Sequence, residues 1–223
     1  MAERFTVLTV CTGNIHRSPL AADLLRTWAE WYLPQEVAAS IVVESAGTGA
    51  PVGRSMGRTA SRIAQALGAE PAEHRARQLA DDMIERADLV LVAATHHRDD
   101  VLARVPRALR KVFTVREAGR IAELLLPDAG AGVAVRAGAA VTQMRARVAA
   151  FSDNRAAGGT GVDDIIDPHG LGTDAYLQMT IEAVEPLTAL AGVLFGMPQV
   201  EVDAYRAFVA DTASVRRLIA TAP

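Results

Sequence analysis

The sequence predicts an α/β fold: a four-stranded, mostly parallel sheet, doubly wound, with helices on both faces. Short β-rich runs alternate with stretches in which apolar residues recur at helical spacing. The run at residues 88–93 is almost entirely apolar, as expected for a strand covered on both faces. The 223 residues, 50% hydrophobic and 22% charged, are enough for one sizeable packed domain.

The first half of the chain contains all the expected strands. They lie at residues 5–10, 41–45, 88–93 and 111–115. Helical patterns lie between them, at residues 20–32, 59–67, 80–86 and a helix closing at 101–109. Gly-containing turns follow the first two strands, and the second of these turns spans residues 46–51. Parallel sheets of this kind bind ligands at the carboxyl ends of strands, where the strand order reverses.

The second half is expected to be helical. Helical patterns cover residues 121–126, 135–151, 174–195 and 203–220. A break is predicted at residues 127–132, and the glycine-containing segment 152–162 is expected to be a mobile loop. Pro186 is expected to interrupt the long helical pattern that contains it.

Charge and composition argue against several classes of protein. A net charge of -3 and a pI near 6.0 are not those of a nucleic-acid binder. No apolar run approaches the roughly 20 residues that cross a bilayer, and the first ten residues lack a secretory pattern, so we expect no membrane insertion. Cys11 is the only cysteine, which excludes an intrachain disulfide and suits a cytoplasmic location.

The loop after the first strand has the composition of an anion site. It reads Cys11-Thr12-Gly13-Asn14-Ile15-His16-Arg17-Ser18-Pro19. A short loop between a strand end and a helix start points its N–H groups inward, around a tetrahedral anion. Glycine and asparagine tolerate the left-handed backbone that such a ring requires, and the Arg17 fork suits two phosphate oxygens. We therefore expect phosphate to be bound by Thr12, Gly13, Asn14, Ile15, His16 and Arg17.

Cys11 stands at the lip of this ring. The helix end, the amide groups and Arg17 would stabilise its thiolate, which is how a cysteine becomes nucleophilic at neutral pH. A lone cysteine at a strand end is usually an inert core residue, but Arg17 and Ser18 at these spacings favour a nucleophile. Ser18 and Pro19 also suit a helix cap and a first helical residue. The Ser18 hydroxyl therefore has two alternatives, capping the helix or contacting the sulfur.

These motifs together resemble the low-molecular-weight protein tyrosine phosphatase family. The arrangement Cys-x5-Arg-Ser in a strand-loop-helix setting is accompanied by Ser45-Ala46-Gly47-Thr48, His74-Arg75-Ala76-Arg77-Gln78-Leu79, the strand 87–92 and Asp167-Pro168. The resemblance covers about residues 5–118 and 163–177. It implies a flavodoxin-like strand order and a single phosphatase-like domain over residues 1–223. Relative to the family core, the chain has an insertion around 119–162 and extra helices after residue 197.

The resemblance implies hydrolysis of phosphotyrosine or similar aryl phosphomonoesters through a cysteinyl-phosphate on Cys11, without metal or cofactor. Arg17 would hold the phosphate, and Ser18 would ease departure of the sulfur. Asp167 would protonate the leaving oxygen and then activate water. Pro168 disfavours helix at Asp167 and so favours it over Asp163 and Asp164, which lie close by.

The chain departs from the family pattern at the mouth of the expected site. His16 stands where many members have a second cysteine, and a protonated His16 would further favour the thiolate. Ala50-Pro51 and His169 replace aromatic residues of tyrosine-specific members, so the slot for a phenyl ring is expected to be shallower. Ile15 is aliphatic as in the tyrosine branch, whereas the phosphoarginine branch tends to have threonine there.

Other polar residues are expected to be structural. We expect His74 and Arg75 to form hydrogen bonds that support the fold, and His96 and His97 to start a solvated helix. A metal site made from Cys11 and His16 is not expected, because two ligands in an anion-binding ring do not make a cation site.

Two further functions stay open at this point: an arsenate reductase that uses an external small thiol, and a non-catalytic phosphate-binding regulatory protein. The expected partner is a phosphorylated protein or a small phosphomonoester. For residues 119–162 and the tail, the sequence does not choose between a cover over the site, a dimer contact and a surface for a kinase partner, and it does not indicate the oligomeric state.

Overall fold

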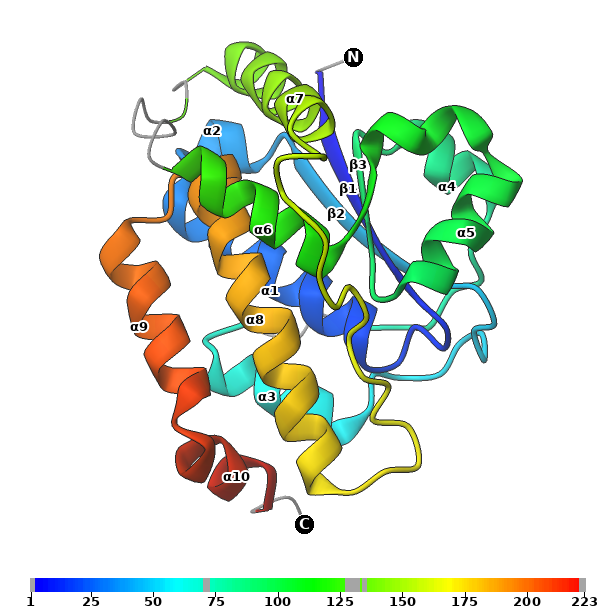
Figure 1. Ribbon diagram of the computed structural model, residues 1–223, viewed down its shortest axis with the longest axis vertical. Helices are drawn as coiled ribbons and strands as arrows, with labels where there is room; N and C mark the ends of the chain where they lie inside the picture. Colours follow the sequence, from blue (N-terminus) through cyan, green and yellow to red (C-terminus); the bar gives the residue numbers. More distant parts are fainter. Residues whose placement is uncertain (1–2, 70–72, 127–132, 134–135, 221–223) are drawn as a thin grey trace.

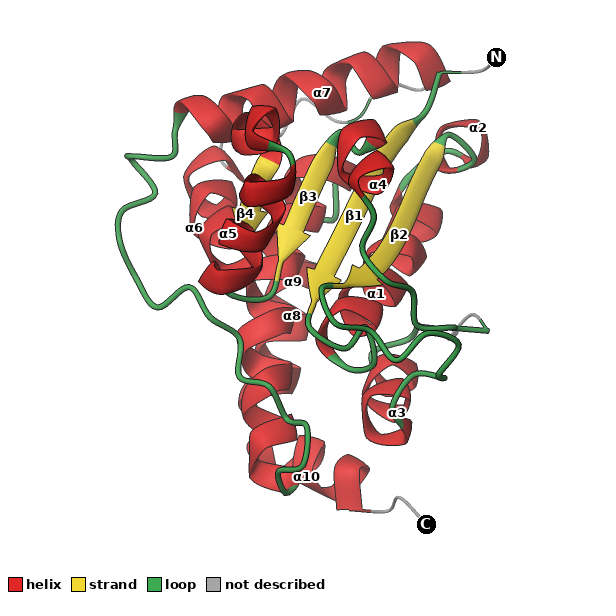
Figure 2. Ribbon diagram, turned by 90° about the vertical axis from the view of Figure 1, so that its right-hand side faces the viewer, coloured by secondary structure: helices red, strands yellow, loops and turns green. Residues whose placement is uncertain are grey.

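The strands form one parallel sheet in the order β2-β1-β3-β4, as Figure 2 shows, and Figure 1 colours the chain from its N-terminus to its C-terminus. A computed structural model describes residues 3–69, 73–126, 133 and 136–220, without the side chains of 218–220. The strands are β1 (Phe5–Cys11), β2 (Ile41–Gly47), β3 (Leu89–Val92) and β4 (Val112–Thr114), all paired in parallel. The chain moves from β1 outward to β2 and then returns to β3 on the other side of β1. The predicted fold class and strand order are confirmed, and Cys11 ends β1 at the point where the order reverses.

Helices cover both faces of the sheet. On one face lie α1 (Arg17–Tyr32) and α6 (Val115–Leu125), with α8 (Thr173–Phe195) packed against both. On the other lie α4 (Asp81–Arg86), α5 (Thr95–Arg104) and the 3-10 helix η1 (Pro106–Lys111). Because side chains alternate along a strand, β1 and β3 supply both cores. Phe5, Val7, Leu89 and Leu91 pack under α1 and α6, whereas Leu8, Val10, Val90 and Val92 pack under α4 and α5.

The remaining helices lie around this layered core. The short helices α2 (Gln35–Ala38) and α3 (Arg58–Ala66) flank β2 in sequence, and α9 (Gln199–Ala210) and α10 (Thr212–Ala220) follow α8. Helix α7 (Ala137–Asp153) crosses the end of the sheet where the strands begin, opposite the loop after β1 (Figure 2). This position excludes the alternative that α7 covers the expected site.

The C-terminal helices pack onto the core rather than extending away from it. The hydroxyl of Tyr205 on α9 accepts a hydrogen bond from Trp28 Nε1 at 3.0 Å and donates one to the carbonyl of Leu67 at 3.1 Å. One side chain of the tail thereby connects α1 with the end of α3. Across the described residues, no helix combines the length and the apolar character needed to span a bilayer.

Several predicted boundaries are wrong, each for a local reason. Helix α5 ends at Arg104, and the chain continues as a 3-10 helix from Pro106, because proline disfavours α-helical backbone at the preceding residue. The tail is two helices rather than one, broken at Asp211. The Asp211 carboxylate accepts a hydrogen bond from the Ser214 N–H at 3.2 Å, which caps the new helix. The break predicted at 127–132 lies outside the described residues.

The predicted interruption at Pro186 is also wrong, because α8 runs through it without a break. Gly119 of α6 explains how the two helices meet there. A methyl group on Gly119 would lie 2.2 Å from Pro186 Cβ, so α6 approaches α8 more closely than any other residue would permit. This packing offsets the main-chain hydrogen bond that a proline removes.

Candidate functional site

The loop that joins β1 to α1 is held in a strained shape by Asn14. Its φ of 51° lies in the left-handed region, where asparagine is tolerated. The side-chain Oδ1 accepts from the Arg77 N–H at 2.9 Å, and Nδ2 donates to Ser18 Oγ at 3.0 Å. His74 Nε2 donates to the Asn14 carbonyl at 2.7 Å, as expected for a structural residue. The loop is therefore fixed from three directions.

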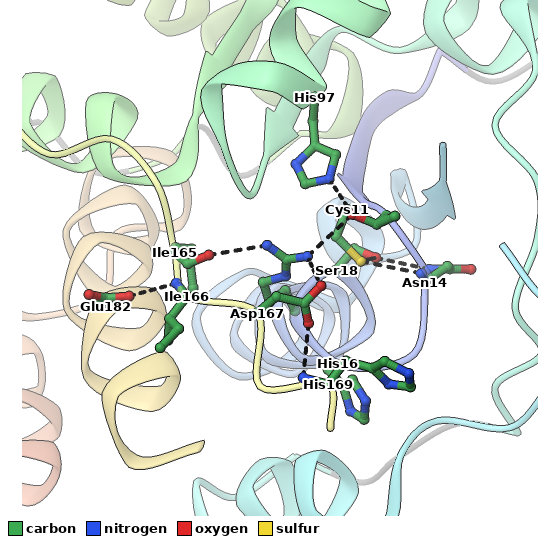
Figure 3. A network of polar contacts seen from close by, with 12 residues as sticks. Cys11, Asn14, His16, Ser18, His97, Ile165, Ile166, Asp167, His169 and Glu182 are labelled. Carbon is green, nitrogen blue, oxygen red and sulfur yellow. Dashed lines mark hydrogen bonds and ion pairs between the residues drawn. The ribbon is translucent and has the colours of Figure 1, made fainter. Parts of the chain in front are cut away.

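The Cys11 sulfur lies beside Ser18 and Asn14 of this loop (Figure 3). Its Sγ is 3.0 Å from Ser18 Oγ, and the Asn14 N–H points at it from 3.3 Å. Both groups are suited to stabilise a thiolate. Cys11 is only 2% exposed, yet it lines a cavity of about 240 Å³, so a small oxyanion can approach it from that side.

The two alternatives for Ser18 are distinguished by where the helix begins. Helix α1 starts at Arg17, so His16 occupies the capping position and makes no side-chain cap. Ser18 is one residue inside the helix and contacts the sulfur instead. Of the two alternatives left open for the Ser18 hydroxyl, the contact with the sulfur is therefore the one observed.

Arg17 and Asp167 form an ion pair over the ring. Arg17 is 5% exposed, and its Nη2 lies 2.5 Å from Asp167 Oδ2. Nη1 donates to the Ile165 carbonyl at 3.1 Å, while Nε is buried and has no hydrogen-bond partner among the described residues. A buried, unpaired guanidinium donor costs free energy unless an acceptor reaches it. Arg17, which lines the same cavity as Cys11, therefore has one donor without a partner among the described residues.

The other two aspartates near Asp167 point elsewhere. Asp163 pairs with Arg120 at 2.6 Å, and Asp164 accepts a hydrogen bond from the Thr95 N–H at 2.7 Å. The structure thus brings Asp167, and neither of its neighbours, to Arg17. Within the described part of the chain, no group of three or more His, Cys, Asp and Glu side chains is arranged to hold a metal ion.

The mouth of the cavity lacks the side chains that usually grip a phenyl ring. Beyond the loop, its wall consists of Gly49, Pro51, Arg54, Asp167 and His169. None of the lining residues that the structure describes is phenylalanine, tyrosine or tryptophan. Pro51 and His169 stand at the two positions where the sequence predicts that aromatic residues of tyrosine-specific members are replaced.

His16 is packed in a small aromatic cluster beside the mouth. Its ring meets Tyr176 edge-on at 5.5 Å and lies 5.8 Å from the His169 ring. Burial lowers the pKa of His16, and the nearby Asp167 opposes this shift only in part. The neutral imidazole is therefore favoured at neutral pH, contrary to the idea that a protonated His16 supports the thiolate.

His97 is a site residue that the sequence interpretation missed. Helix α5 does begin at Thr95, but His97 is fully buried rather than solvated, and its Nε2 lies 2.9 Å from Thr12 Oγ1 (Figure 3). Burial, and then the neighbouring His96, lower the pKa of His97 to about 3. A signal was present in the sequence, because His97 closely follows β3, whose carboxyl end lies beside that of β1.

Comparisons with known proteins point to one family. Residues 6–128 match the family described as low molecular weight phosphotyrosine protein phosphatase. Over 112 residues the chain is 37% identical to a probable low molecular weight protein-tyrosine-phosphatase, EpsP, from Ralstonia solanacearum, which covers 50% of this chain and 71% of that protein. Over 113 residues it is 36% identical to a protein-arginine-phosphatase from Geobacillus stearothermophilus, covering 51% and 70% of the two chains.

Solved structures show the same fold. The YwlE arginine phosphatase from Geobacillus stearothermophilus superposes with a TM-score of 0.57 at 27% identity, covering 88% of this chain and 94% of that one. The tyrosine phosphatase Wzb from Escherichia coli K30, in complex with phosphate, gives a TM-score of 0.56 at 21% identity, with 85% and 91% covered.

Proposed function

The chain belongs to the low molecular weight phosphotyrosine protein phosphatase family, and we propose that it hydrolyses phosphotyrosine or similar aryl phosphomonoesters through a cysteinyl-phosphate on Cys11. The observation that carries this proposal is the free, buried Nε of Arg17, a residue that lines the same cavity as Cys11. An oxyanion in the ring would satisfy that donor, and arginine binds phosphate through two parallel donors.

In the first step, the Cys11 thiolate attacks phosphorus, and the bond from phosphorus to the ester oxygen breaks. Arg17 and the loop residues Thr12, Gly13, Asn14, Ile15 and His16 bind the phosphate oxygens as charge develops on them. Asp167 gives its proton to the departing oxygen. Its closeness to Arg17, at 2.5 Å, supports this role because it places the carboxyl beside the bound phosphate.

In the second step, the Asp167 carboxylate takes a proton from water, the water oxygen bonds to phosphorus, and the phosphorus–sulfur bond breaks. Ser18 Oγ, at 3.0 Å from the sulfur, supports the thiolate as it leaves. Inorganic phosphate is released and Cys11 returns to its starting state.

Phosphoarginine is a second candidate substrate, because one relative is named a protein-arginine-phosphatase. Ile15, which lines the cavity, favours an aryl phosphate instead, since its aliphatic side chain offers no polar partner to a guanidinium. Neither arsenate reduction nor a purely regulatory role is favoured by the named relatives, which are phosphatases.

The wider setting follows from this proposal. We propose that residues 1–223 act as a single phosphatase-like domain in the cytoplasm, where the lone cysteine stays reduced. The substrate is a phosphorylated protein or a small phosphomonoester. We also propose a kinase partner, because a phosphotyrosine substrate has to be produced by a kinase.

The test is turnover of an aryl phosphate by the full chain in the presence of a chelator. We expect activity that vanadate blocks, that exceeds activity on phosphoarginine, and that Cys11→Ser abolishes while phosphate binding remains. Circular dichroism of Cys11→Ser is the control for folding. Retained turnover in Cys11→Ser would end the proposal, and faster release of phosphate from phosphoarginine would replace the substrate class.

A further inference from the structure

We infer that Glu182 is a positioning residue for the proposed general acid, holding the main chain beside Asp167 so that the Asp167 carboxyl stays over Arg17 and Cys11. The inference rests on the proposed function and adds to it a residue on α8 that touches neither the substrate site nor Asp167 itself. Figure 3 shows Glu182 reaching from its helix to Ile166.

The segment that leads to Asp167 is anchored at every residue. Asp163 is held by Arg120 of α6 at 2.6 Å. Asp164 accepts from the Thr95 N–H through its side chain, at 2.7 Å, and from Arg116 Nη1 through its carbonyl, at 3.3 Å. The segment therefore begins by bridging α6 and the start of α5.

The next two residues bring the segment to the phosphate-binding ring. The Ile165 N–H donates to the Ala93 carbonyl at the end of β3, at 2.8 Å, and its own carbonyl accepts from Arg17 at 3.1 Å. The Ile166 N–H then donates to Glu182 Oε2 at 2.8 Å. Glu182 thus makes the last of these anchors before Asp167.

Glu182 is itself held firmly. Its other oxygen, Oε1, accepts from Gln178 at 2.9 Å and lies 3.3 Å from Arg116 Nη1, and the side chain is only 13% exposed. Arg116 contacts both Glu182 and the Asp164 carbonyl, so the same guanidinium holds the Glu182 carboxylate and the loop that leads to Asp167. Beyond Asp167 the main-chain N–H groups bond locally: that of His169 donates to Asp167 Oδ1 at 3.2 Å, and that of Leu171 donates to the Pro168 carbonyl. The hydrogen bonds that connect this loop to α8, α6 and the end of β3 lie on the N-terminal side of Asp167.

The position of this loop matters because Asp167 is the exposed partner of its ion pair. The Asp167 side chain is 43% exposed, against 4% for Arg17, so packing alone does not fix it. A displacement of about 1 Å at a reacting group can cost about 100-fold in rate. Removing the Glu182 carboxylate also leaves the Ile166 N–H without its acceptor, which favours a shifted loop.

If the role of Glu182 were purely structural, its carboxylate would serve only the ion pair with Arg116, which connects α8 to α6. The two roles differ in their dependence on the leaving group. A phenol of low acidity needs a proton from Asp167 as it departs, whereas a strongly acidic phenol leaves without one. Loss of positioning therefore affects kcat/KM for the first kind of ester selectively, and general loss of folded protein affects both equally.

The experiment compares the full-length wild-type chain with Glu182→Ala, Glu182→Gln and the control Glu185→Ala. Glu185 is exposed, lies on the same helix and, among the described residues, makes no side-chain hydrogen bond or ion pair with residues 163–167. We expect Glu182→Ala to lower kcat/KM about tenfold for a phenol of low acidity and less than about twofold for a strongly acidic one. Glu182→Gln keeps an acceptor oxygen and should stay within about threefold of wild type on both esters.

Hydrogen exchange at the Ile166 amide gives a readout that does not depend on activity. It should be faster in Glu182→Ala than in the wild type or in Glu185→Ala. Equal losses on both esters, no loss on either, or an unchanged exchange rate at Ile166 would each overturn the inference. A wild-type chain that hydrolyses no aryl phosphate would instead overturn the proposed function from which the inference starts.

Discussion

Asp167 Oδ2 lies 2.5 Å from Arg17 Nη2, although the two residues are 150 positions apart in the chain. Arg17 is the fixed partner, because Nη1 is bound to the Ile165 carbonyl and the side chain is almost fully buried. A phosphate group in the ring would use the same guanidinium. The Asp167 carboxylate and the substrate phosphate therefore compete for the Arg17 guanidinium. When phosphate displaces the Asp167 carboxyl, that carboxyl remains beside the ester oxygen.

This relationship predicts two opposite effects of Asp167→Asn. The amide neither donates the proton nor activates water, so kcat/KM for an aryl phosphate should fall by about 10²–10⁴-fold. Inorganic phosphate should inhibit at a lower concentration than in the wild type, because the competing negative charge is gone. Steady-state kinetics with phosphate as inhibitor measure both. Asp174→Asn, at an exposed position on α8, is the control; weaker phosphate binding in Asp167→Asn would contradict the competition.

The parts of the site that could be predicted are those encoded within short segments. The loop from Cys11 to Ser18 combines a strand end, flexible residues, a fork of donors and a helix start. Each of these features can be recognised from a few consecutive residues. Asp167 could be selected over Asp163 because Pro168 follows it. The structure brings the same residues together, although the meeting of Asp167 with Arg17 across 150 positions depends on packing that neither segment encodes alone.

The parts that could not be predicted depend on which surfaces meet. The pair His96-His97 looks like a polar helix start, and only the docking of α5 beside the loop buries His97. Pro186 looks like a helix breaker, but Gly119 on another helix leaves room for a continuous α8. Glu182 looks like any polar residue on an amphipathic helix. Such roles arise from contacts between elements, which periodicity does not encode.

Gly47 should be essential for the shape of the anion ring. A Cβ at this position would lie 2.4 Å from the Thr12 carbonyl oxygen and 2.9 Å from the Asn14 amide nitrogen, both main-chain atoms of the loop. Gly47→Ala must therefore displace the loop, and we expect kcat/KM to fall at least about tenfold and phosphate binding to weaken.

Gly49→Ala is the matched control, two residues further along the same turn. The nearest atom to its Cβ would be Thr12 Cγ2 at 3.9 Å, an ordinary contact. Its kcat/KM should stay within about twofold of wild type. Equal activity in the two variants would show that the ring tolerates displacement at Thr12 and Asn14.

His97 should make the folded chain sensitive to acid. The folded state takes up a proton at His97 only near pH 3, whereas the unfolded chain does so near the ordinary value of 6.5. Between these values the unfolded state holds more protons, so the free energy of unfolding falls as the pH is lowered and is unaffected by this group above about 6.5. His16 and His74, whose pKa values are also lowered by burial, act in the same direction.

His97→Gln isolates this contribution, because glutamine can still donate to Thr12 Oγ1 but does not titrate. Urea unfolding at pH 7.5 and pH 5 should show the wild type losing about 1–2 kcal/mol more than His97→Gln on acidification. The other histidines contribute equally to both proteins and cancel in the comparison. Identical losses would mean that His97 takes up its proton in the folded state near the ordinary value.

Ser18 should matter more for the second chemical step than for the first. Its Oγ lies 3.0 Å from the Cys11 sulfur, where it can donate to the thiolate that leaves when the cysteinyl-phosphate is hydrolysed. In Ser18→Ala we expect breakdown of the intermediate to slow about tenfold, while its formation changes less. Rapid mixing with an aryl phosphate separates the two rates, because phenol release in the first turnover reports formation and the later steady rate reports breakdown.

The first-turnover rate serves as an internal control for folding and for the geometry of the ring, which Asn14 Nδ2 also supports through Ser18. If formation slows as much as breakdown, Ser18 acts by holding the loop and not by stabilising the departing sulfur.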